Sequence, residues 1–577
     1  YKGVTPPNPH TQSFPVTKDE RTYRVFCLGG STTQGTPYPP NGAFPAFLKY
    51  VLKTLHPDKR IEVINCGVTA IASYSVVDMA EEILERYQPD LLVVYTGHNE
   101  FYGVFGLGSQ LSLFRSRSLV RWFLKLQQFR LFRLIREVAV ELGNLSLRRD
   151  RPQPIGTLMG AVIRDARILY GDEVFRRTER YYRQNLQELV QAAQVHRTDI
   201  ILCTLASNLR DLPPFASAHG GALSAEDSLR CEELLNAARQ ALEAGRVEAA
   251  LPPLQEAFRL DSTYAETRYL LGKYYDARQE YREAYRHYRW ARDYDVIRFR
   301  APSSFNRIIR EVAGEYGAPV ADVAKAFADA SPGGIMGNNL FTEHVHPNHR
   351  GYFLIGKTVA RTMAEQGMLS PRWDWGRDLP DSSYLAMAHL SPLALELANA
   401  GIFRLTSYWP FRTAGQRRTY HRVGDARTEA LALHYIRSPK ISPVQLHIQL
   451  GNEYLSKGKI EKALAEFEAA AAREPQHCRA NLYAGQVYGR KVVALLQGHE
   501  DPRRALRVFQ RAEAYLQKAA LYCPKDPEVH LNLGKLYSLM PGKKEKARAE
   551  FRRVLELDPR NNEARRGLAA LEKPSGR

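Results

Sequence analysis

The sequence is poor in cysteine and lacks long apolar runs. Six cysteines in 577 residues are too few for a disulfide framework. Cys27, Cys66 and Cys203 each lie in an apolar run typical of a buried strand, so we expect free core thiols there. The chain has no run of 18 apolar residues, which excludes a bilayer-spanning helix within this sequence.

The composition shows no other extreme except charge. With 44% hydrophobic, 25% charged and 10% aromatic residues, the chain is neither disordered nor collagen-like, and its length predicts three or four compact units. The excess of 81 Lys+Arg over 62 Asp+Glu gives a net charge of +19, which suits anionic lipid, acidic glycan or nucleic acid. No helix-turn-helix, zinc-finger or RNA-recognition pattern accompanies this charge, so no nucleic-acid partner is expected.

The first hundred residues alternate short apolar runs with helical patterns. Each run is rich in Val, Ile and Leu and is followed by Gly and small polar residues, the rhythm of a parallel β-α-β sheet. The same rhythm resumes much later in the chain, which predicts one α/β domain that is interrupted and then completed. The predicted strands are 24–29, 61–66, 91–96, 199–205 and 319–322, with helices near 180–195, 304–316 and 350–366.

The interruption at 228–296 has no strand pattern but shows a 34-residue period. Small and apolar residues recur where the two helices of a tetratricopeptide repeat (TPR) approach closely, and two inserted repeats resembling that motif are predicted. Ordinary amphipathic helices are the alternative. The recurring residues are Ala250, Leu254 and Ala257, then Ala284, Tyr288 and Ala291, with Gly272 and Tyr275 at the first-helix positions.

The C-terminal region carries a stronger form of this pattern. Helical periodicity alone fixes no Gly, Ala and Pro offsets, so three repeats resembling TPRs are predicted. Their stacked helices form a concave surface, for which we expect one helix or one extended peptide as the partner. The repeat positions are Gly451, Tyr454, Ala463, Phe467, Ala470 and Pro475; Gly485, Tyr488, Ala512, Leu516, Ala519 and Pro524; and Gly534, Tyr537, Ala547, Phe551, Val554 and Pro559.

These patterns divide the chain into five predicted segments. An α/β domain occupies two of them and encloses the inserted repeats, and an aperiodic, Arg-rich connector precedes the C-terminal repeats. The boundaries are 1–227 and 297–375 for the α/β domain, 228–296 for the inserted repeats, 376–440 for the connector and 441–577 for the C-terminal TPR domain.

A Gly-rich turn, GGSTTQG, follows the first predicted strand. Its small residues allow a sharp turn that presents Ser31 at the carboxyl edge of the sheet, where open α/β sheets place their ligand sites. A phosphate site at a helix N-terminus is the alternative, but neither Gly-x-Gly-x-x-Gly nor a Walker pattern is present. Ser31 is therefore a candidate nucleophile.

Two further segments end at the same predicted edge. Gly67 follows the second strand, and Asn99 lies in the GHNE segment after the third. The N–H groups of Gly67 and Ser31, with the side-chain amide of Asn99, are suitable donors for an oxyanion. The alternative is that Gly67 ends a strand and Asn99 caps a helix.

The segment Thr-Glu-His-Val-His-Pro-Asn precedes the last predicted helix. A nucleophilic serine needs an imidazole base held in one tautomer by a carboxylate. Glu343, three residues before His346, can fold back in a tight turn, so His346 is the predicted base. A metal site of Glu343 with His344, His346 and His349 is the alternative. The helical His-Glu-x-x-His pattern is absent and a proline breaks any helix there, so no metal or other cofactor is expected.

The four segments around Ser31, Gly67, Asn99 and His346 resemble the sequence blocks of the SGNH (GDSL-like) hydrolases, in the same order. This resemblance covers roughly residues 20–225 and 297–370. It implies a flavodoxin-like three-layer α/β/α fold. It also implies a metal-free Ser–His–acid mechanism for an esterase, acyl-hydrolase or deacetylase.

Carried over position by position, the resemblance assigns roles and exposes departures. Ser31 is then the nucleophile, His346 the base, Glu343 the orienting acid, and Ser31, Gly67 and Asn99 the oxyanion hole. Glu343 stands where the family usually has Asp, Glu100 replaces the Asp after the block-three Asn, and Gly30 replaces the Asp before the nucleophile. A misplaced orienting carboxylate costs about 10⁴-fold in turnover in serine proteases, so Glu343 is the departure that bears most on activity.

An unusually long stretch, 101–177, separates the third and fourth predicted strands. Within it, residues 115–142 are apolar, aromatic and basic on a helical period. A substrate lid, a membrane-surface helix and a partner-docking helix all suit this segment, and a helix packed on the sheet with solvated arginines is the alternative. Its aromatic and apolar members are Trp122, Phe123, Leu126, Phe129 and Phe132, interleaved with Arg121, Arg130, Arg133 and Arg136.

The sequence supports two hypotheses of different classes. The first is an SGNH-type serine esterase or acyl-hydrolase acting on an ester such as an O-acetylated glycan or a lipid, with TPRs recruiting protein partners. The second is a non-catalytic assembly subunit of an envelope complex. Because the chain begins at Tyr1 instead of Met, we expect a preceding signal peptide or anchor. A bacterial envelope location, periplasmic or membrane-anchored, is therefore expected.

Overall fold

The computed structural model divides the chain into two compact units. One comprises Tyr1–Met387 with Gly401–Tyr420, and the other Ala388–Ala400 with His421–Arg577. No helix in the part of the chain described here is long and apolar enough to cross a membrane. The described residues are 9–109, 116–126, 129, 130, 132, 167–220, 223–412, 418–438, 441–498 and 501–572.

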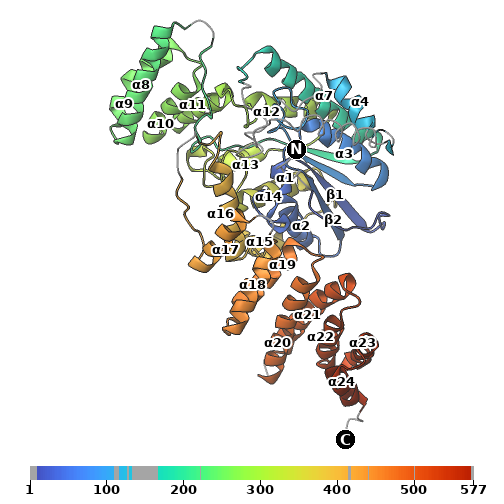
Figure 1. The fold of residues 1–577 in the computed structure, drawn as a ribbon. Coiled ribbons are helices and arrows are strands. Elements are labelled where there is room, and N and C mark those ends of the chain that lie inside the picture. Colours follow the sequence, from blue (N-terminus) through green and yellow to red (C-terminus); the bar gives the residue numbers. More distant parts are fainter. Residues whose placement is uncertain are drawn as a thin grey trace, which may run out of the picture. The chain divides into compact units, whose positions relative to one another are not determined.

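Five parallel strands form the sheet of the first unit (Figure 1). The spatial order β2-β1-β3-β4-β5 is that of a flavodoxin-like fold. β3 is buried along its whole length, which explains why it is a continuous apolar run without alternation. The strands are β1 (Thr22–Gly29), β2 (Arg60–Gly67), β3 (Leu91–Tyr95), β4 (Asp199–Cys203) and β5 (Val320–Ala321).

Helices cover the sheet in two contacting groups, which completes the predicted three-layer α/β fold (Figure 1). Helices α2 and α14 contact each other, and α7 contacts both α3 and α12. In the strand register, Gly29 pairs with Gly67 on one side and with Tyr95 on the other, so the loops after β1, β2 and β3 leave the sheet at one edge. The helices are α2 (Phe44–Leu55), α3 (Ser73–Arg86), α7 (Glu173–Val195), α12 (Ser303–Tyr316), α13 (Val323–Asp329) and α14 (His349–Glu365).

Two helix pairs are inserted between β4 and α12 (Figure 1). The small and apolar residues of the 34-residue period are buried between them, including Ala250 and Ala284. A Cβ on Gly272 would lie 2.6 Å from the ring of Tyr288, so that close approach requires glycine. The helices are α8 (Ala225–Glu243), α9 (Val247–Leu260), α10 (Ala265–Ala277) and α11 (Tyr281–Tyr294).

The C-terminal repeats use glycine in the same way. In each pair the first-helix glycine faces a large side chain of the second helix: a Cβ on Gly451 would lie 2.5 Å from Phe467, and one on Gly534 would lie 2.7 Å from Phe551. Shape complementarity therefore explains the fixed glycine offsets. The helices are α18 (Pro443–Ser456), α19 (Ile460–Arg473), α20 (Cys478–Gln497), α21 (Pro502–Tyr522), α22 (Pro527–Ser538), α23 (Lys544–Leu557) and α24 (Asn562–Glu572).

Two glycines on α20 provide a matched test of this packing. A Cβ on Gly485 would lie 2.6 Å from the buried Leu516, whereas one on Gly489 meets nothing within 4 Å. We expect Gly485→Ala to lower the unfolding free energy of the repeats by about 1–3 kcal/mol through overpacking. Gly489→Ala should raise it by about 0.5–1 kcal/mol because alanine favours a helix. Urea unfolding followed by circular dichroism measures both, and equal effects would contradict the packing explanation.

The cysteines divide into core thiols and one disulfide. Cys27, Cys66 and Cys203 carry free thiols as predicted. Cys478 at the start of α20 and Cys523 at the C-cap of α21 form a disulfide across 45 residues, a pairing that the sequence patterns did not indicate. The bond joins the N-terminal end of α20 to the C-terminal end of α21.

Removing this disulfide should destabilise the C-terminal repeats. Closing a loop of this length in the unfolded chain corresponds to about 4 kcal/mol in the chain-entropy model. We expect dithiothreitol to lower the unfolding midpoint of the repeats in the full chain, and Cys478→Ser to lower it by a similar amount. The reducing agent should then have no further effect on the Cys478→Ser variant, and a residual effect would show that reduction acts elsewhere.

The predicted connector contains helices that belong to different units. α15 (Asp381–Met387) lies in the first unit and α17 (Ala426–Arg437) in the second, while α16 (Pro392–Thr406) extends from the second into the first. The segment 401–420 thus belongs to the sheet-containing unit, although both flanking segments belong to the unit with the C-terminal repeats.

Candidate functional site

Ser31 lies at a sharp turn between β1 and the short helix α1 (Ser31–Gln34). A Cβ on Gly29 would lie 2.1 Å from the carbonyl oxygen of Tyr95 and 2.2 Å from Thr33 Oγ1, so only glycine fits. Thr33 Oγ1 donates a hydrogen bond to that same carbonyl at 3.1 Å. The Gly-rich segment therefore fixes Ser31 at the carboxyl edge of the sheet, as predicted.

Ser31, His346 and Glu343 form a hydrogen-bonded series. His346 Nε2 lies 2.7 Å from Ser31 Oγ, and His346 Nδ1 lies 2.5 Å from Glu343 Oε1. The backbone N–H of His346 also donates to Glu343 Oε1 at 2.7 Å. Glu343 and His346 are 4% and 7% exposed. This is the geometry of a serine activated by an imidazole whose tautomer a carboxylate fixes.

A tight turn before α14 brings Glu343 back onto His346. The N–H of Thr342 donates to the carbonyl oxygen of His346 at 2.9 Å, and Phe341 bridges to Pro347. Asn348 then caps α14 by accepting from two backbone N–H groups of its first turn. The turn and the cap together hold the imidazole at the sheet edge.

Burial sets the protonation of the His346 imidazole. Loss of solvent lowers its pKa to about 4, because the charged form is disfavoured in the interior. The Glu343 carboxylate beside Nδ1 opposes this shift, because it stabilises the imidazolium. The lowered pKa keeps the ring neutral at neutral pH, and the carboxylate holds its proton on Nδ1. Nε2 is then able to accept a proton from Ser31.

Asn99 lies beside the Ser31 turn. Its Nδ2 donates to the carbonyl oxygen of Ile71 at 3.1 Å, and a Cβ on Gly30 would lie 2.8 Å from the same nitrogen. The amide therefore lies against the backbone that immediately precedes Ser31. One of its two N–H bonds is used by Ile71, which leaves the second available for a ligand.

Gly67 does not join this group of donors. Its N–H donates to Asn65 Oδ1 at 2.9 Å, and a Cβ on Gly67 would lie 2.1 Å from the backbone nitrogen of Gln34. The glycine is thus required for packing of β2 against α1. Because its N–H is already engaged, Gly67 is not free to act as an oxyanion donor.

Ala70, next to Ile71, is a residue that the sequence patterns did not single out. Its φ of 63° places it in the left-handed region, which alanine rarely adopts. Its carbonyl oxygen accepts from the N–H of Val104 at 3.0 Å, and the next residue, Ile71, contacts the Asn99 amide. Among the residues described here, no acceptor takes the N–H of Ala70. No sequence signal marks an alanine with this conformation.

The Glu100 side chain binds the first residue of α3. Its buried carboxylate accepts from the N–H and hydroxyl of Ser73 at 2.8 and 2.7 Å. Burial raises its pKa to about 7, against these two hydrogen bonds. Glu100 therefore anchors the start of α3 to the loop after β3.

Three of the four residues of the alternative metal site lie close together in the structure. Glu343, His344 and His346 bring possible ligand atoms within 4.8 Å of one another, and His349 is not in that group. Both ring nitrogens of His346 already have partners, Ser31 and Glu343. A metal ion on Nδ1 would displace the carboxylate, so the donor set fits the hydrogen-bonded series better than it fits an ion.

Helix α4 (Arg117–Leu126) is the described part of the long basic segment. It packs against α3 within the first unit. Arg121 is not solvated, because it is 8% exposed and pairs with Glu81 and Glu188 at 2.5 and 2.6 Å, whereas Arg130 is exposed as the packed-helix alternative predicted. Trp122 is 60% exposed. The remaining residues of 115–142 lie mostly outside the described residues, so the lid, membrane and docking hypotheses stay predictions.

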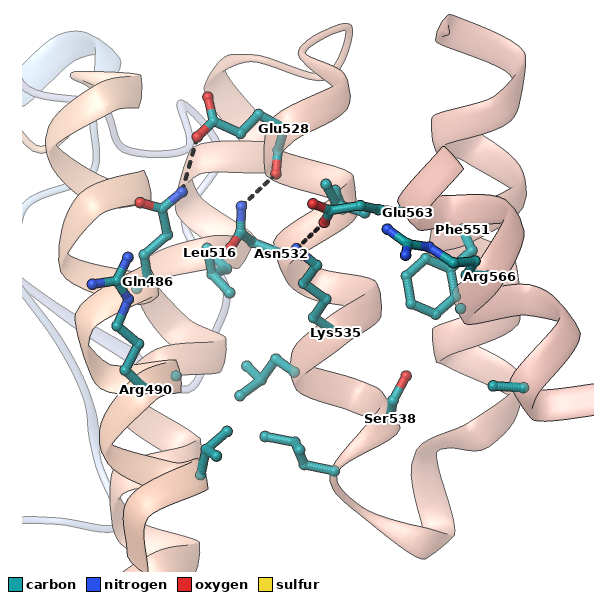
Figure 2. Close-up of a pocket in the computed structure, with 18 of the residues that line it drawn as sticks. Gln486, Arg490, Leu516, Glu528, Asn532, Lys535, Ser538, Phe551, Glu563 and Arg566 are labelled. Atoms are coloured by element: carbon teal, nitrogen blue, oxygen red, sulfur yellow. Dashed lines mark hydrogen bonds and ion pairs between the residues drawn. The ribbon is translucent and has the colours of Figure 1, made fainter. Parts of the chain in front are cut away.

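The C-terminal repeats contain a groove of about 1050 Å³. Figure 2 shows Arg490, Lys535 and Arg566 among the residues that line it, with Lys535 paired to Glu563. Arg490 and Arg566 also line the groove, and the charge of Arg566 helps to lower the pKa of Glu563. The groove therefore offers two guanidinium groups to a ligand.

Comparison with known families identifies the repeats. Tetratricopeptide repeat models match residues 448–491 and 527–561. The C-terminal unit thus contains TPRs, as predicted, and such repeats mediate protein interactions. No curated protein sequence matches the chain.

Solved structures similar to parts of the chain fall into two groups. An α/β hydrolase from the metagenome of Lake Arreo, Spain, is 14% identical, with a TM-score of 0.27 over 59% of this chain and 94% of its own. An acetylxylan esterase from Geobacillus stearothermophilus is 12% identical, with a TM-score of 0.27 and the same coverages. The Arabidopsis OM64 TPR domain is 19% identical, with a TM-score of 0.19 over 22% of this chain and 93% of its own. Similarity at this level carries no information on activity.

Proposed function

We propose that this protein is a serine esterase of the SGNH type whose TPRs bind protein partners. The observation that carries the proposal is the hydrogen-bonded series from Ser31 through His346 to Glu343. The 2.7 Å contact between Oγ and Nε2 lies within the range expected of an activated nucleophile. An assembly subunit without catalysis has no need for this alignment.

In the acylation step, Ser31 Oγ attacks the ester carbonyl carbon while His346 Nε2 takes the hydroxyl proton. The carbonyl oxygen becomes an oxyanion. When the tetrahedral intermediate collapses, the C–O bond to the alcohol breaks and His346 returns the proton to the departing alcohol. Glu343 stabilises the imidazolium between these events.

Deacylation repeats the same chemistry with water. His346 Nε2 accepts a proton from a water molecule, whose oxygen attacks the acyl-Ser31 carbonyl. Collapse of the second intermediate breaks the bond to Ser31 Oγ, which recovers its proton from His346. The products are a carboxylic acid and the free enzyme.

Three donors are proposed for the oxyanion: the N–H of Ser31, the remaining N–H of Asn99 and the N–H of Ala70. Two observations support this proposal: Asn99 contacts both Ile71 and the backbone that precedes Ser31, and no described residue accepts from the N–H of Ala70. Such preorganised donors stabilise the transition state without reorganising.

The proposed substrate is an O-acetylated glycan or a lipid ester, consistent with the net charge of +19. We also propose a bacterial envelope location. The Cys478–Cys523 disulfide supports it, because such bonds persist in oxidising compartments. For the C-terminal groove, the two arginines that line it favour a helix or extended peptide with acidic side chains.

Covalent labelling tests the serine mechanism directly. A fluorophosphonate should form a stable adduct with the folded full-length protein, and peptide mapping should place that adduct on Ser31. Labelling should also block hydrolysis of p-nitrophenyl acetate with the same time course. A folded protein that neither reacts nor hydrolyses the ester would favour the assembly function.

The esterase activity should decrease as the pH is lowered. A protonated His346 cannot accept the Ser31 proton, so kcat/KM should decrease tenfold per pH unit below its pKa. Burial lowers that pKa to about 4 and Glu343 opposes the shift, so the midpoint should lie between about 4 and the ordinary histidine value of about 6.5. A pH–rate profile measures it. A profile that stays flat to well below pH about 4 would argue against an imidazole base.

A further inference from the structure

Glu343 contacts a second imidazole besides that of His346. Its Oε1 accepts from His346 Nδ1 and from the His346 backbone N–H. Its Oε2 lies in direct contact with Nδ1 of His344. Neither Oε2 nor that nitrogen has a hydrogen-bond partner elsewhere among the described residues, and both atoms are buried. Because a buried carboxylate oxygen without a donor is costly, the two atoms satisfy one another only if Nδ1 carries a proton.

The surroundings of His344 support this tautomer. The side chain is 4% exposed, and burial, together with the nearby His346 and Arg300, lowers its pKa well below the ordinary value. The ring is therefore neutral and has a single N–H. With Nδ1 facing a carboxylate oxygen, that N–H points at Glu343.

Three aromatic rings hold the His344 imidazole in place. The rings of Phe215, Phe299 and Phe411 lie edge-on to it, with centroids at 5.6, 6.0 and 5.3 Å. The carbonyl oxygen of His344 also accepts from the N–H of Asn208 at 2.9 Å. Both ring and backbone are thus fixed by packing.

We propose that His344 is a positioning residue for the Ser31–His346–Glu343 series, an inference that rests on the proposed esterase function. A glutamate has one more rotatable bond than the aspartate usual in SGNH hydrolases, so its carboxylate is harder to fix. The N–H of His344 holds Oε2 while His346 uses Oε1. The longer acid is thereby kept in one orientation, and His346 in one tautomer.

Two substitutions of His344 discriminate this role from simple packing. In His344→Asn the amide nitrogen takes the place of Nδ1, whereas in His344→Phe the ring shape remains without a donor. We expect His344→Phe to lower kcat for p-nitrophenyl acetate by about 10- to 100-fold, with KM within about twofold because no substrate contact is lost. His344→Asn should recover most of kcat. His349→Phe, in the same segment but without a described contact to Glu343, is the matched control.

A readout independent of turnover keeps the test decisive. The proton shared by His346 Nδ1 and Glu343 should give a far-downfield proton resonance, assigned by its absence in His346→Gln. We expect the resonance to be retained in His344→Asn and lost or shifted in His344→Phe, with unchanged circular dichroism and melting temperature in both. Similar resonances and rates in the two variants would overturn the positioning role. An inert wild type that retains the resonance pattern would instead contradict the esterase function alone.

A metal role for the same residues is tested in parallel. If EDTA abolished wild-type activity and Zn²⁺ restored it, Glu343, His344 and His346 would be ligands and the positioning role would be wrong. We expect EDTA to leave kcat unchanged, because His346 already uses both of its nitrogens.

Discussion

Ser31→Ala abolishes ester hydrolysis, with an expected loss of about 10⁶-fold in kcat, as for the serine of another serine hydrolase. The methyl group cannot attack a carbonyl carbon, and His346 Nε2 loses the Ser31 hydroxyl that it contacts at 2.7 Å. Fluorophosphonate labelling should disappear together with turnover. Hydrolysis of p-nitrophenyl acetate by the purified full-length variant measures the loss.

A distant serine provides the control for this substitution. Ser262 is exposed in the turn between α9 and α10, and Ser262→Ala should retain full activity and labelling. Because Ser31 itself is partly exposed at the start of a short helix, Ser31→Ala should also keep the melting temperature. Substantial turnover in folded Ser31→Ala would require another nucleophile.

Glu343→Gln should lower kcat by about 10⁴-fold, the cost observed when the orienting carboxylate of a serine protease becomes an amide. The amide has the same size but cannot stabilise the imidazolium, and it can hold His346 in the wrong tautomer. The acid limb of the pH–rate profile should also move to lower pH, since the carboxylate no longer opposes the effect of burial on the pKa of His346. Steady-state rates from pH 4 upward measure both changes.

The variant Glu343→Asp separates the effect of the carboxylate charge on turnover from the effect of side-chain length. Aspartate keeps the charge and matches the residue usual in SGNH hydrolases, so this variant should be far more active than Glu343→Gln. Equal losses in the two variants would mean that the length of the side chain, and not its charge, controls turnover. Full activity in Glu343→Gln would remove Glu343 from the mechanism.

The sequence predicted the parts of the site that depend on parallel strands ending at one edge of the sheet or on residues close together in the chain. Parallel strands end at one edge, so Ser31 and Asn99 were expected together, and three residues are enough for Glu343 to turn back onto His346. Gly67 shows the limit of this reasoning. A glycine kept for close packing against Gln34 and a glycine kept for a free N–H have the same sequence pattern.

Other features depend on tertiary packing and had no sequence signal. The left-handed backbone of Ala70 is imposed by its surroundings, since alanine has no preference for it. The pairing of Arg121 with two glutamates depends on helices distant in sequence. The five strands were predicted within a few residues, because hydrophobic periodicity fixes them locally. The helix predicted near 180–195 begins earlier, at Glu173, and the connector predicted without a period contains α15, α16 and α17.

The segment 401–420 belongs to the first unit, although the chain on both sides of it belongs to the second. The chain passes from one unit to the other at 387–388, 400–401 and 420–421. Phe411, in the segment between the last two of these points, contacts the ring of His344. The proposed ester site and the repeats are therefore joined through this continuous stretch of chain. If either ligand changes the ordering of that stretch, thermodynamic reciprocity requires the other to feel an equal change in affinity. Substrate would then change the affinity for the partner by the same factor as the partner changes the affinity for substrate.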